Sequence, residues 1–304
     1  MCAGCSPKTP QIKTAEGYIN VSGGIELYYQ SVGAATAQDT IIVLHGGPGA
    51  GMNAVKEPLI PLADHFVLLF YDQRGGGRSS LPQNKELLDG EYYIEDIEMI
   101  RRHFSMESVN LLAHSFGTIL GAEYANRYPH RIERMAFIGA VGPSREEAAK
   151  VYGASSVSPD TALSNRAGRL ISELLEGTAD DPVRNCRDYE KINRMLAEIR
   201  GETTTWTGTV CDAPSQAVAY YYQYTAQITP KSFGNWDYTQ SMDIVNAPLL
   251  VVHGEEDSTG ANSQKLWAET FQNGQLFTVA DAGKSAITDQ PEQVISRLVE
   301  FFKK

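Results

Sequence analysis

Short apolar runs separated by amphipathic stretches occupy both ends of the chain. Such runs are typical of strands that are buried on both faces of a parallel sheet. They cover residues 40–45 (TIIVLH), 66–71 (FVLLFY), 109–113 (VNLLA), 134–140 (RMAFIGA), 247–254 (APLLVVHG) and 274–280 (GQLFTVA). The sequence therefore predicts one parallel sheet whose strands come from two blocks that are far apart in the chain.

Helical spacing fills the intervals between these runs. Ile94, Ile97, Ile100 and Phe104 recur at three- and four-residue steps, which places them on one face of a helix. Another helix is predicted after residue 113, ending at the proline of RYP (127–129), and a last one at 291–302. Residues 18–30 instead alternate around a Gly-Gly pair, as in a hairpin. This order of elements predicts an α/β fold with a mostly parallel central sheet.

The middle of the chain departs from this pattern. Residues 144–240 are polar, contain helix-forming stretches such as RLISELLEG, and have no buried-strand run. We predict that they form a helical lid inserted into a core made of residues 17–143 and 241–304. Residues 1–16 are predicted to be a flexible N-terminal segment.

Composition and charge exclude some classes of partner. The 304 residues are 42% hydrophobic, which is enough for one large core with an inserted subdomain. Asp and Glu number 37 against 26 Lys and Arg, so the formal charge is −11. Because an acidic surface repels phosphate backbones, we expect no nucleic-acid partner. No apolar run approaches the ~20 residues that span a bilayer, so we expect no transmembrane segment.

The four cysteines fall into two pairs. Cys2 and Cys5, in MCAGCSP, resemble the end of a bacterial lipoprotein signal without its apolar segment. Two interpretations stay open: a trimmed signal of an exported lipoprotein with a lipid anchor at Cys5, or a flexible N-terminus of a cytoplasmic protein. If the protein is exported, we predict a disulfide between Cys186 and Cys211 that stabilises the lid by ~3 kcal/mol. Neither pair has zinc-site spacing, so we expect no metal, and nothing in the sequence calls for a cofactor.

Two glycine-containing segments that follow predicted strands suggest nucleophilic catalysis. LLAHSFGT (111–118) places Ser115 between a buried strand and a helix, which is similar to the G-x-S-x-G nucleophile elbow with Ala113 in the first glycine position. HGGPG (45–49) follows an earlier strand, and its glycines let backbone N–H groups approach a substrate carbonyl. We predict an oxyanion hole formed by the N–H groups of Gly47 and Phe116, with Gly46 as the alternative donor.

Three motifs in this order resemble the proline iminopeptidase branch of the α/β-hydrolase superfamily: HGGPG (45–49), DQRGGGRSS (72–80) and HSFG (114–117). The resemblance covers roughly residues 17–143 and 245–304 and implies an α/β-hydrolase fold. It also implies a Ser–Asp–His triad in that chain order, which hydrolyses an N-terminal aminoacyl or prolyl amide, or a small ester, through an acyl-enzyme. Ser115 takes the nucleophile position. Asp257, in VVHGEEDS (251–258), takes that of the acid.

The histidine position of this family is occupied by Lys284, in DAGKSAITDQPE (281–292), and no histidine follows His253. A lysine accepts the serine proton only if desolvation lowers its pKa by about three units. The negative charge of Asp257 beside it would instead raise the pKa of the lysine. We therefore predict an inert Lys284–Asp257 ion pair and an impaired hydrolase. Two alternatives stay open. One is a working Ser–Lys esterase or amidase, or a non-hydrolytic enzyme that uses the lysine cation; the other is a ligand-binding pseudoenzyme.

Other polar residues near these motifs are predicted to be structural. We expect Asp72, Arg74 and Arg78 to form an ion pair and brace their loop. His45 is predicted to be buried and structural, His114 to point away from the site, and His253 to lie in the core.

Aromatic residues of the lid are candidate substrate contacts. Tyr220, Tyr221 and Tyr224, in AVAYYYQYTA (217–226), and Trp236, in WDY (236–238), could line an apolar pocket, or could instead pack the lid onto the sheet. Aminopeptidases of the resembling family hold the free amine of the substrate with lid carboxylates, and this tyrosine-rich stretch has none. The lid glutamates Glu173, Glu176, Glu190 and Glu198 cannot be placed from the sequence. An esterase or amidase of small apolar substrates is therefore the alternative to a peptidase of short peptides.

Overall fold

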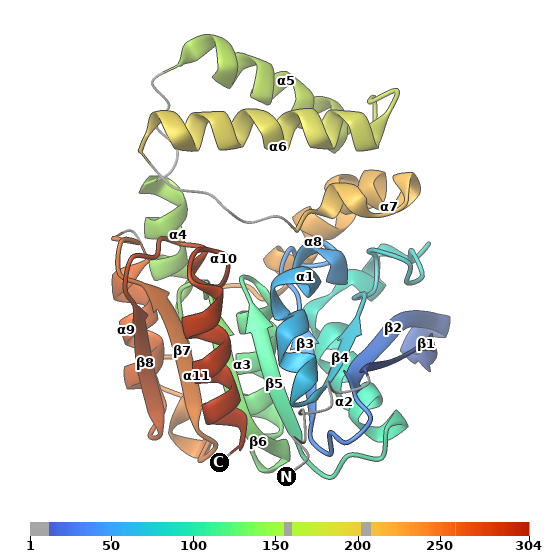
Figure 1. Cartoon of the computed structure of the whole chain (residues 1–304). Helices are drawn as coiled ribbons and strands as arrows, with labels where there is room; N and C mark the ends of the chain where they lie inside the picture. The colour runs from blue at the N-terminus through green and yellow to red at the C-terminus, as the bar shows by residue number, and fades with distance from the viewer. Residues whose placement is uncertain (1–11, 155–159, 202–207, 259, 304) are drawn as a thin grey trace, which may run out of the picture.

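In the computed structural model, which describes residues 12–154, 160–201, 208–258 and 260–303, the strands form a single sheet (Figure 1). The strands are β1 (Ile12–Val21), β2 (Ile25–Ala34), β3 (Thr40–Leu44), β4 (Val67–Tyr71), β5 (Val109–His114), β6 (Ile132–Ile138), β7 (Leu249–Gly254) and β8 (Gly274–Val279). Their order is β1-β2-β4-β3-β5-β6-β7-β8. The pairs β1–β2 and β2–β4 are antiparallel, and the remaining neighbours are parallel, which confirms the mostly parallel sheet.

The N-terminal hairpin begins earlier than predicted. Gly23 and Gly24 have positive φ angles of 77° and 70° and form the turn between β1 and β2, as the alternating pattern of residues 18–30 indicates. Strand β1 pairs with β2 along its whole length, from Ile12 opposite Ala34. Residues 12–16 therefore belong to the core sheet and not to a flexible segment, which corrects the boundary at residue 17. Residues 1–11, with Cys5 and the predicted lipid anchor, lie outside the described residues.

Helices cover both faces of the sheet, as expected for strands whose side chains alternate between two buried faces. Leu111 and Ala113 of β5 join one apolar cluster, and Leu112 between them joins the other. The core helices are α1 (Lys56–Leu59), α2 (Gly90–His103), α3 (Gly117–Arg127), α9 (Ala261–Thr270), α10 (Ala286–Asp289) and α11 (Pro291–Lys303). Side chains of α2, α3 and α9 pack on the first face, and those of α1 and α11 on the second (Figure 1).

The polar middle block, residues 144–240, lies between β6 and β7 in the sequence. Its helices are α4 (Arg145–Ala154), α5 (Thr161–Glu176), α6 (Pro182–Ile199), α7 (Ser215–Tyr220) and α8 (Ala226–Ser232), with a π-helical turn η7 (Tyr221–Thr225) before α8. Helices α5 and α6 form a hairpin at one end of the molecule, and α7 and α8 lie between that hairpin and the sheet (Figure 1). A β-bridge between Ser144 and Asp237 joins the first and last parts of this block.

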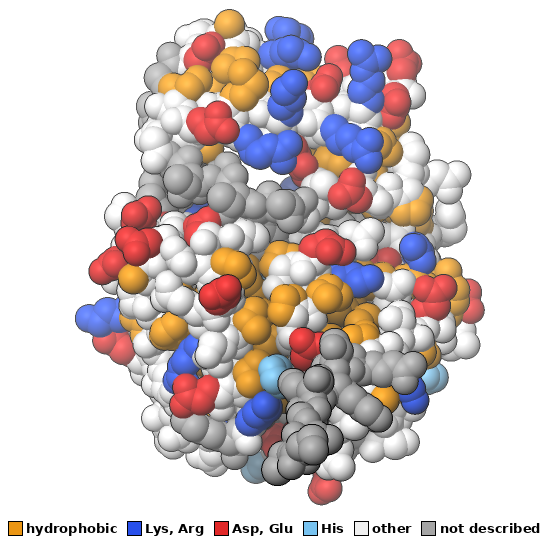
Figure 2. All heavy atoms as spheres, viewed as in Figure 1, with side chains coloured by type: hydrophobic (Ala, Val, Ile, Leu, Met, Phe, Trp, Pro, Cys, Tyr) orange, Lys and Arg blue, Asp and Glu red, His pale blue; other side chains and the backbone are white. Residues whose placement is uncertain are grey.

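A small apolar cluster supports the α5–α6 hairpin. Its buried members are Ala167, Ile192 and Leu196. In Figure 2, Lys and Arg side chains gather over the same hairpin, whereas Asp and Glu side chains are spread over the whole visible face. No helix in the described ranges is long and apolar enough to cross a bilayer.

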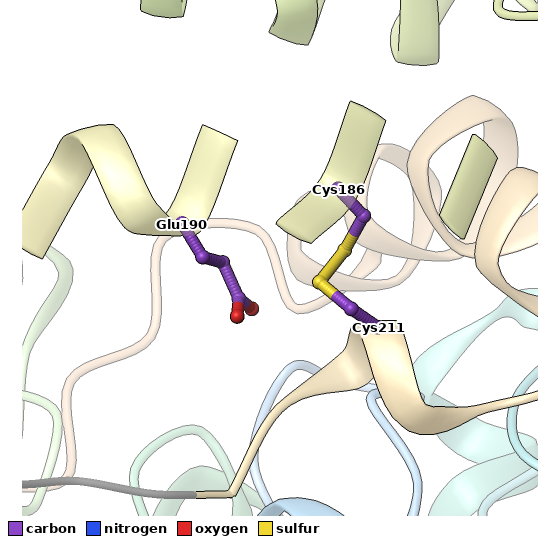
Figure 3. Close-up of side chains that lie close together, drawn as sticks. All are labelled: Cys186, Glu190 and Cys211. Carbon is purple, nitrogen blue, oxygen red and sulfur yellow. A yellow bond between two sulfur atoms is a disulfide. The ribbon is translucent and has the colours of Figure 1, made fainter. Parts of the chain in front are cut away.

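A disulfide joins Cys186 of α6 to Cys211 of the short helix η6 (Val210–Asp212), with the Cα atoms 5.6 Å apart (Figure 3). The predicted pairing is therefore confirmed. Glu190 extends from the next turn of α6 toward the disulfide (Figure 3). Its carboxylate and the two sulfur atoms lie within 4.8 Å of one another, which is close enough for three ligands of one metal ion. Since the two sulfur atoms are bonded to each other, neither is available as a thiolate ligand.

Candidate active site

Ser115 lies in the tight turn between β5 and α3, with a φ angle of 53°. This left-handed conformation is unfavourable for residues other than glycine, and the surrounding hydrogen bonds hold it in place. The Ser115 N–H donates to the Ile138 carbonyl at 3.2 Å, and the Ser115 carbonyl accepts from the N–H and hydroxyl of Thr118 at 3.0 and 2.7 Å. The turn leaves the Ser115 side chain partly exposed at the start of a helix.

Two glycines make room for this turn. A Cβ atom at Gly117 would lie 2.3 Å from the Leu44 carbonyl oxygen, so α3 can approach the end of β3 only with glycine there. A Cβ atom at Gly46 would lie 2.8 Å from the Ser115 Cβ and 3.1 Å from its Oγ. The HGGPG segment therefore contacts the serine directly, although the two are far apart in the sequence.

The predicted oxyanion donors are available for a ligand. Gly47 has a φ angle of 120° and is exposed, while Phe116 is buried directly after Ser115. Within the part of the chain that the structure describes, neither the Gly47 N–H nor the Phe116 N–H has a hydrogen-bond acceptor. Because backbone N–H groups are otherwise almost always paired, two such donors beside one serine can stabilise an oxyanion. The N–H of Gly46, the alternative donor, likewise has no acceptor among the described residues, so hydrogen bonding does not distinguish it from Gly47.

The loop after β4 holds the HGGPG segment in position. The Gln73 side chain donates to the His45 carbonyl at 2.8 Å and accepts from the Gly49 N–H at 2.9 Å. The Asp72 carboxylate accepts from the N–H groups of Met52 and Arg78. These contacts agree with the bracing function predicted for this loop. Gln73, which contributes two of these four hydrogen bonds, was not identified from the sequence.

The same loop contains a buried ion pair. The Arg74 guanidinium binds the Asp96 carboxylate of α2 through two hydrogen bonds of 2.6 and 2.7 Å. Burial raises the pKa of Asp96, and the adjacent Arg74 opposes this shift. Arg74 therefore forms an ion pair, but with Asp96 and not with Asp72, whose carboxylate accepts only backbone N–H groups in the described residues.

Asp257 and Lys284 lie on two loops that contact each other. The Asp257 carboxylate accepts from the Gly260 N–H at 3.1 Å, which fixes the loop after β7. The Glu256 N–H donates to the Ala282 carbonyl at 2.9 Å, and a Cβ atom at Gly254 would lie 2.0 Å from the Gly283 carbonyl oxygen. The sheet therefore brings the predicted acid loop and the loop of the histidine position together.

Lys284 does not bind Asp257 as predicted. Its side chain is exposed, and among the described residues no ion pair of 4.0 Å or less joins these two groups. The charge of Lys284 instead acts on His114, the residue before Ser115: the pKa of His114 is lowered to about 3, chiefly by burial and then by the charges of His45 and Lys284. The predicted ion pair is thus absent, while the positive charge lies near the serine turn.

A cavity of about 330 Å³ opens beside the two oxyanion donors. It is lined by Gly47, Phe116, Val141, Arg145, Ala148, Ala149, Pro230 and Trp236. The walls are mostly apolar, and the lining contains one charged side chain, that of Arg145 at the start of α4. This cavity is the space in which a substrate could place the group attached to its reacting carbonyl.

Comparison with known proteins identifies the family. The model of the alpha/beta hydrolase fold family matches residues 39–291. The chain belongs to this family. It is 25% identical over 287 residues to a proline iminopeptidase of Lactobacillus helveticus (strain DPC 4571), covering 91% of this chain and 94% of that protein.

The chain is also similar to a second proline iminopeptidase and to the solved structure of a related protein. A proline iminopeptidase of Thermoplasma volcanium is 26% identical over 306 residues, covering 95% of this chain and 97% of that protein. The crystal structure of a proline iminopeptidase-related protein from Thermus thermophilus superimposes with a TM-score of 0.64 at 24% identity, covering 96% and 98% of the two chains. The α/β-hydrolase fold and the alpha/beta hydrolase family that the three motifs imply are therefore confirmed.

Besides His114, two other histidines near the serine turn of this alpha/beta hydrolase are buried, in different ways. The His45 ring is enclosed, with Nδ1 donating to the Gly46 carbonyl and Nε2 accepting from the Gln73 N–H, so its pKa is lowered to about 4 by desolvation. His253 is buried at the end of β7, and burial lowers its pKa against the opposing charge of Asp257. Both are neutral at pH 7, which agrees with the structural positions predicted for them.

Three of the four predicted substrate contacts lie outside the cavity. The Tyr220 hydroxyl donates to the Pro82 carbonyl at 2.6 Å, and the Lys85 ammonium lies 4.3 and 4.1 Å from the ring centroids of Tyr220 and Tyr224. Tyr221 packs against Tyr222. These tyrosines attach the inserted block to the core, as the alternative interpretation had it, and only Trp236 lines the cavity.

The cavity also contains a residue that the sequence argument missed. Arg145 follows the loop after β6, and residues at such loops line the sites of α/β folds because they emerge above the carboxyl ends of the strands. That rule could have pointed to residues 139–148. The residues around Arg145 in the sequence, SREE, are instead polar, as at the start of an ordinary exposed helix.

Proposed function

We propose that this protein is a serine hydrolase in which Ser115 attacks the carbonyl carbon of an amide or ester. The observation that carries this proposal is the left-handed Ser115 beside the unpaired N–H groups of Gly47 and Phe116. In the first step the Ser115 Oγ bonds to the carbonyl carbon, and the carbonyl oxygen gains negative charge between these two donors. Collapse of the intermediate expels the amine or alcohol and leaves an acyl-serine, which water then hydrolyses.

Proton transfer is the step that Lys284 impairs. In this proposal the serine proton must pass to a base and then to the leaving group, as it does with the histidine of a triad. Lys284 holds that position in the chain, but its side chain is exposed and so lacks the apolar surroundings in which a lysine acts as a base. We therefore expect slow acylation, with Asp257 unable to act through an imidazole. The Ser–Lys mechanism requires a desolvated lysine, so the exposure of Lys284 speaks against that alternative.

The proposal is tested by labelling with a fluorophosphonate, which reacts with activated serine hydroxyls. We expect slow labelling of Ser115 in the natural chain, and labelling at least about 100-fold faster in Lys284→His, because an imidazole near neutrality supplies general-base catalysis. Ser115→Ala in both backgrounds is the matched control and should not be labelled. Mass spectrometry of the labelled peptide identifies the modified residue.

Each alternative predicts a different result. Equal and fast labelling of the natural chain and Lys284→His would show that Lys284 already acts as the base. Absence of labelling in both, with retained folding by circular dichroism, would overturn the assignment of Ser115 and support a ligand-binding protein. Labelling at a residue other than Ser115 would refute the proposed nucleophile.

The choice between peptide and ester substrates depends on recognition of the substrate amine. The similarity to proline iminopeptidases supports the hydrolysis of an N-terminal prolyl or aminoacyl amide. The lining of the cavity supports the second candidate, an esterase or amidase, because no carboxylate belongs to its described lining. Proline p-nitroanilide and p-nitrophenyl acetate, assayed side by side with Lys284→His, distinguish these two activities.

A further inference from the structure

Arg145 is placed to select the substrate of the proposed hydrolase. It is the first residue of α4 and lines the cavity beside Gly47 and Phe116. Its N–H donates to the Trp236 carbonyl at 2.9 Å, its Nη1 donates to the Pro230 carbonyl at 3.1 Å, and its Cζ lies 4.9 Å from the centroid of the Trp236 ring. Since Trp236 and Pro230 also line the cavity, these contacts fix the guanidinium in its wall.

No carboxylate in the described ranges of the chain neutralises the charge of this guanidinium, because none forms an ion pair with Arg145. The adjacent acidic residues of α4 have another partner, because Lys150 binds Glu146 at 3.0 Å and Glu147 at 2.6 Å. Arg145 thus retains donors that can bind an anion in a largely apolar space, where a charge-assisted hydrogen bond is stronger than in water.

We propose that this cavity binds the acyl group of the substrate, and that the preferred acyl group is an apolar chain ending in a carboxylate that Arg145 binds. The proposal rests on Ser115 being the nucleophile. The planar guanidinium forms paired hydrogen bonds with a carboxylate, and the apolar walls accept the methylene groups between the carboxylate and the reacting carbonyl. A volume of about 330 Å³ is small for a ligand pocket, so the chain is short.

The same geometry disfavours a protonated amine in the cavity. A cation there would approach Arg145 with no carboxylate of the described lining to compensate. Acidic residues do line a second recess on the other side of Trp236, but each has an internal partner: Asp89 with the Glu91 N–H, Glu91 with Arg127, Glu123 with Tyr238, and Asp237 with Thr239. We therefore expect anionic acyl groups to be preferred over neutral ones, and neutral over cationic ones.

The experiment compares three p-nitrophenyl esters of similar length in the Lys284→His background. These are the hydrogen adipate, the hexanoate and the ω-aminohexanoate, each corrected for its rate without enzyme. We expect the ratio of kcat/KM for adipate to that for hexanoate to fall about 10- to 100-fold in Arg145→Gln, the usual range for a hydrogen bond to a charged group. Arg145→Lys should keep part of the ratio, and Lys265→Gln, which removes an exposed cation of α9 outside the cavity, should leave it unchanged.

A binding measurement does not depend on the nucleophile. In Ser115→Ala, the fluorescence of Trp236 should respond to monomethyl adipate at lower concentration than to methyl hexanoate, and the additional change Arg145→Gln should remove the difference. Trp236→Phe identifies the signal, since the chain has 3 tryptophans. Suppose that fluorophosphonate labels Ser115, but Arg145→Gln changes neither the kcat/KM ratio nor the difference in binding between the two esters. The proposal about the substrate is then refuted, and the proposal that the protein is a serine hydrolase stands. If labelling fails while monomethyl adipate still binds through Arg145, the proposal of a serine hydrolase is refuted. The proposal that Arg145 binds an anion then stands.

Discussion

Ser115 is a residue that the surrounding structure holds in an unfavourable backbone conformation. A left-handed conformation costs a residue with a Cβ about 1–3 kcal/mol, and the packing of β5, α3 and the HGGPG segment supplies the compensation. The position that holds a histidine in the resembling family holds Lys284 in this chain. Lys284 is exposed and forms no ion pair with Asp257 among the described residues, so the proposed nucleophile has no desolvated base beside it.

The contribution of Asp257 to the rate of serine labelling should therefore depend on which residue occupies position 284. In the natural chain, Asp257→Asn should change the rate of fluorophosphonate labelling by less than about threefold, because no ion pair with Lys284 is lost and exposed charges interact weakly. In Lys284→His the same change should slow labelling by about 100-fold or more, because the carboxylate then orients the imidazole. Labelling rates of the four proteins form a double-mutant cycle. Equal effects in the two backgrounds would show that Asp257 only supports its loop.

At the scale of elements, the inserted block has weaker support than the sheet. The cluster between α5 and α6 has three buried members, whereas the two clusters of the core extend across all the strands from β1 to β8. The disulfide adds a covalent link between α6 and η6, and Tyr222 and Val218 pack around it. We infer that local opening of the molecule occurs first in this block.

Removing the disulfide should therefore loosen the inserted block and leave the sheet intact. Replacing Cys186 and Cys211 by alanine should lower the free energy of opening of this block by about 3 kcal/mol, the value for a closed loop of this length. Hydrogen exchange followed by mass spectrometry should show faster exchange in residues 182–201 and 208–225. Peptides of β3 and β5 in the same digest are the internal control. Unchanged exchange in α6 would contradict this assignment.

At the scale of the whole molecule, buried imidazoles set the response to acid. Burial lowers the pKa of His45 to about 4 and that of His114 to about 3, and it also lowers the pKa of His253. These side chains stay neutral in the folded protein at pH values where the unfolded chain, with an ordinary histidine pKa near 6.5, binds protons. Stability is thus unaffected by them above pH 7 and falls as the pH decreases from 6.5 toward 4.

The size of this decrease can be measured. At pH 5 a histidine with a folded pKa of about 4 lowers the free energy of unfolding by about 2 kcal/mol relative to pH 7.5. Urea unfolding of the natural chain at both pH values should show the combined effect, and His114→Gln should make the decrease smaller. A His114→Gln protein with the same dependence on pH as the natural chain would refute the contribution of this imidazole.

The sequence by itself determined the features that depend on neighbouring residues. Buried strands follow from continuous apolar runs, the Ser115 turn from small residues between a strand and a helix, and the candidate oxyanion loop from the glycines of HGGPG. These patterns are local because each element must bury its own apolar face and satisfy its own backbone. The pairing of Cys186 with Cys211 also followed, since those were the two cysteines available in the block.

The tertiary structure alone decided the contacts between segments that are far apart in the chain. It showed that Lys284 does not reach Asp257, that Tyr220 and Tyr224 bind Lys85 and not the cavity, and that Arg145 lies in the cavity wall. Side-chain direction and loop position depend on how α4, α7 and α8 pack over the strand ends, and no periodicity in the sequence encodes that packing. The character of the cavity, whose described lining is mostly apolar and contains the cation of Arg145, is therefore a property of the folded chain.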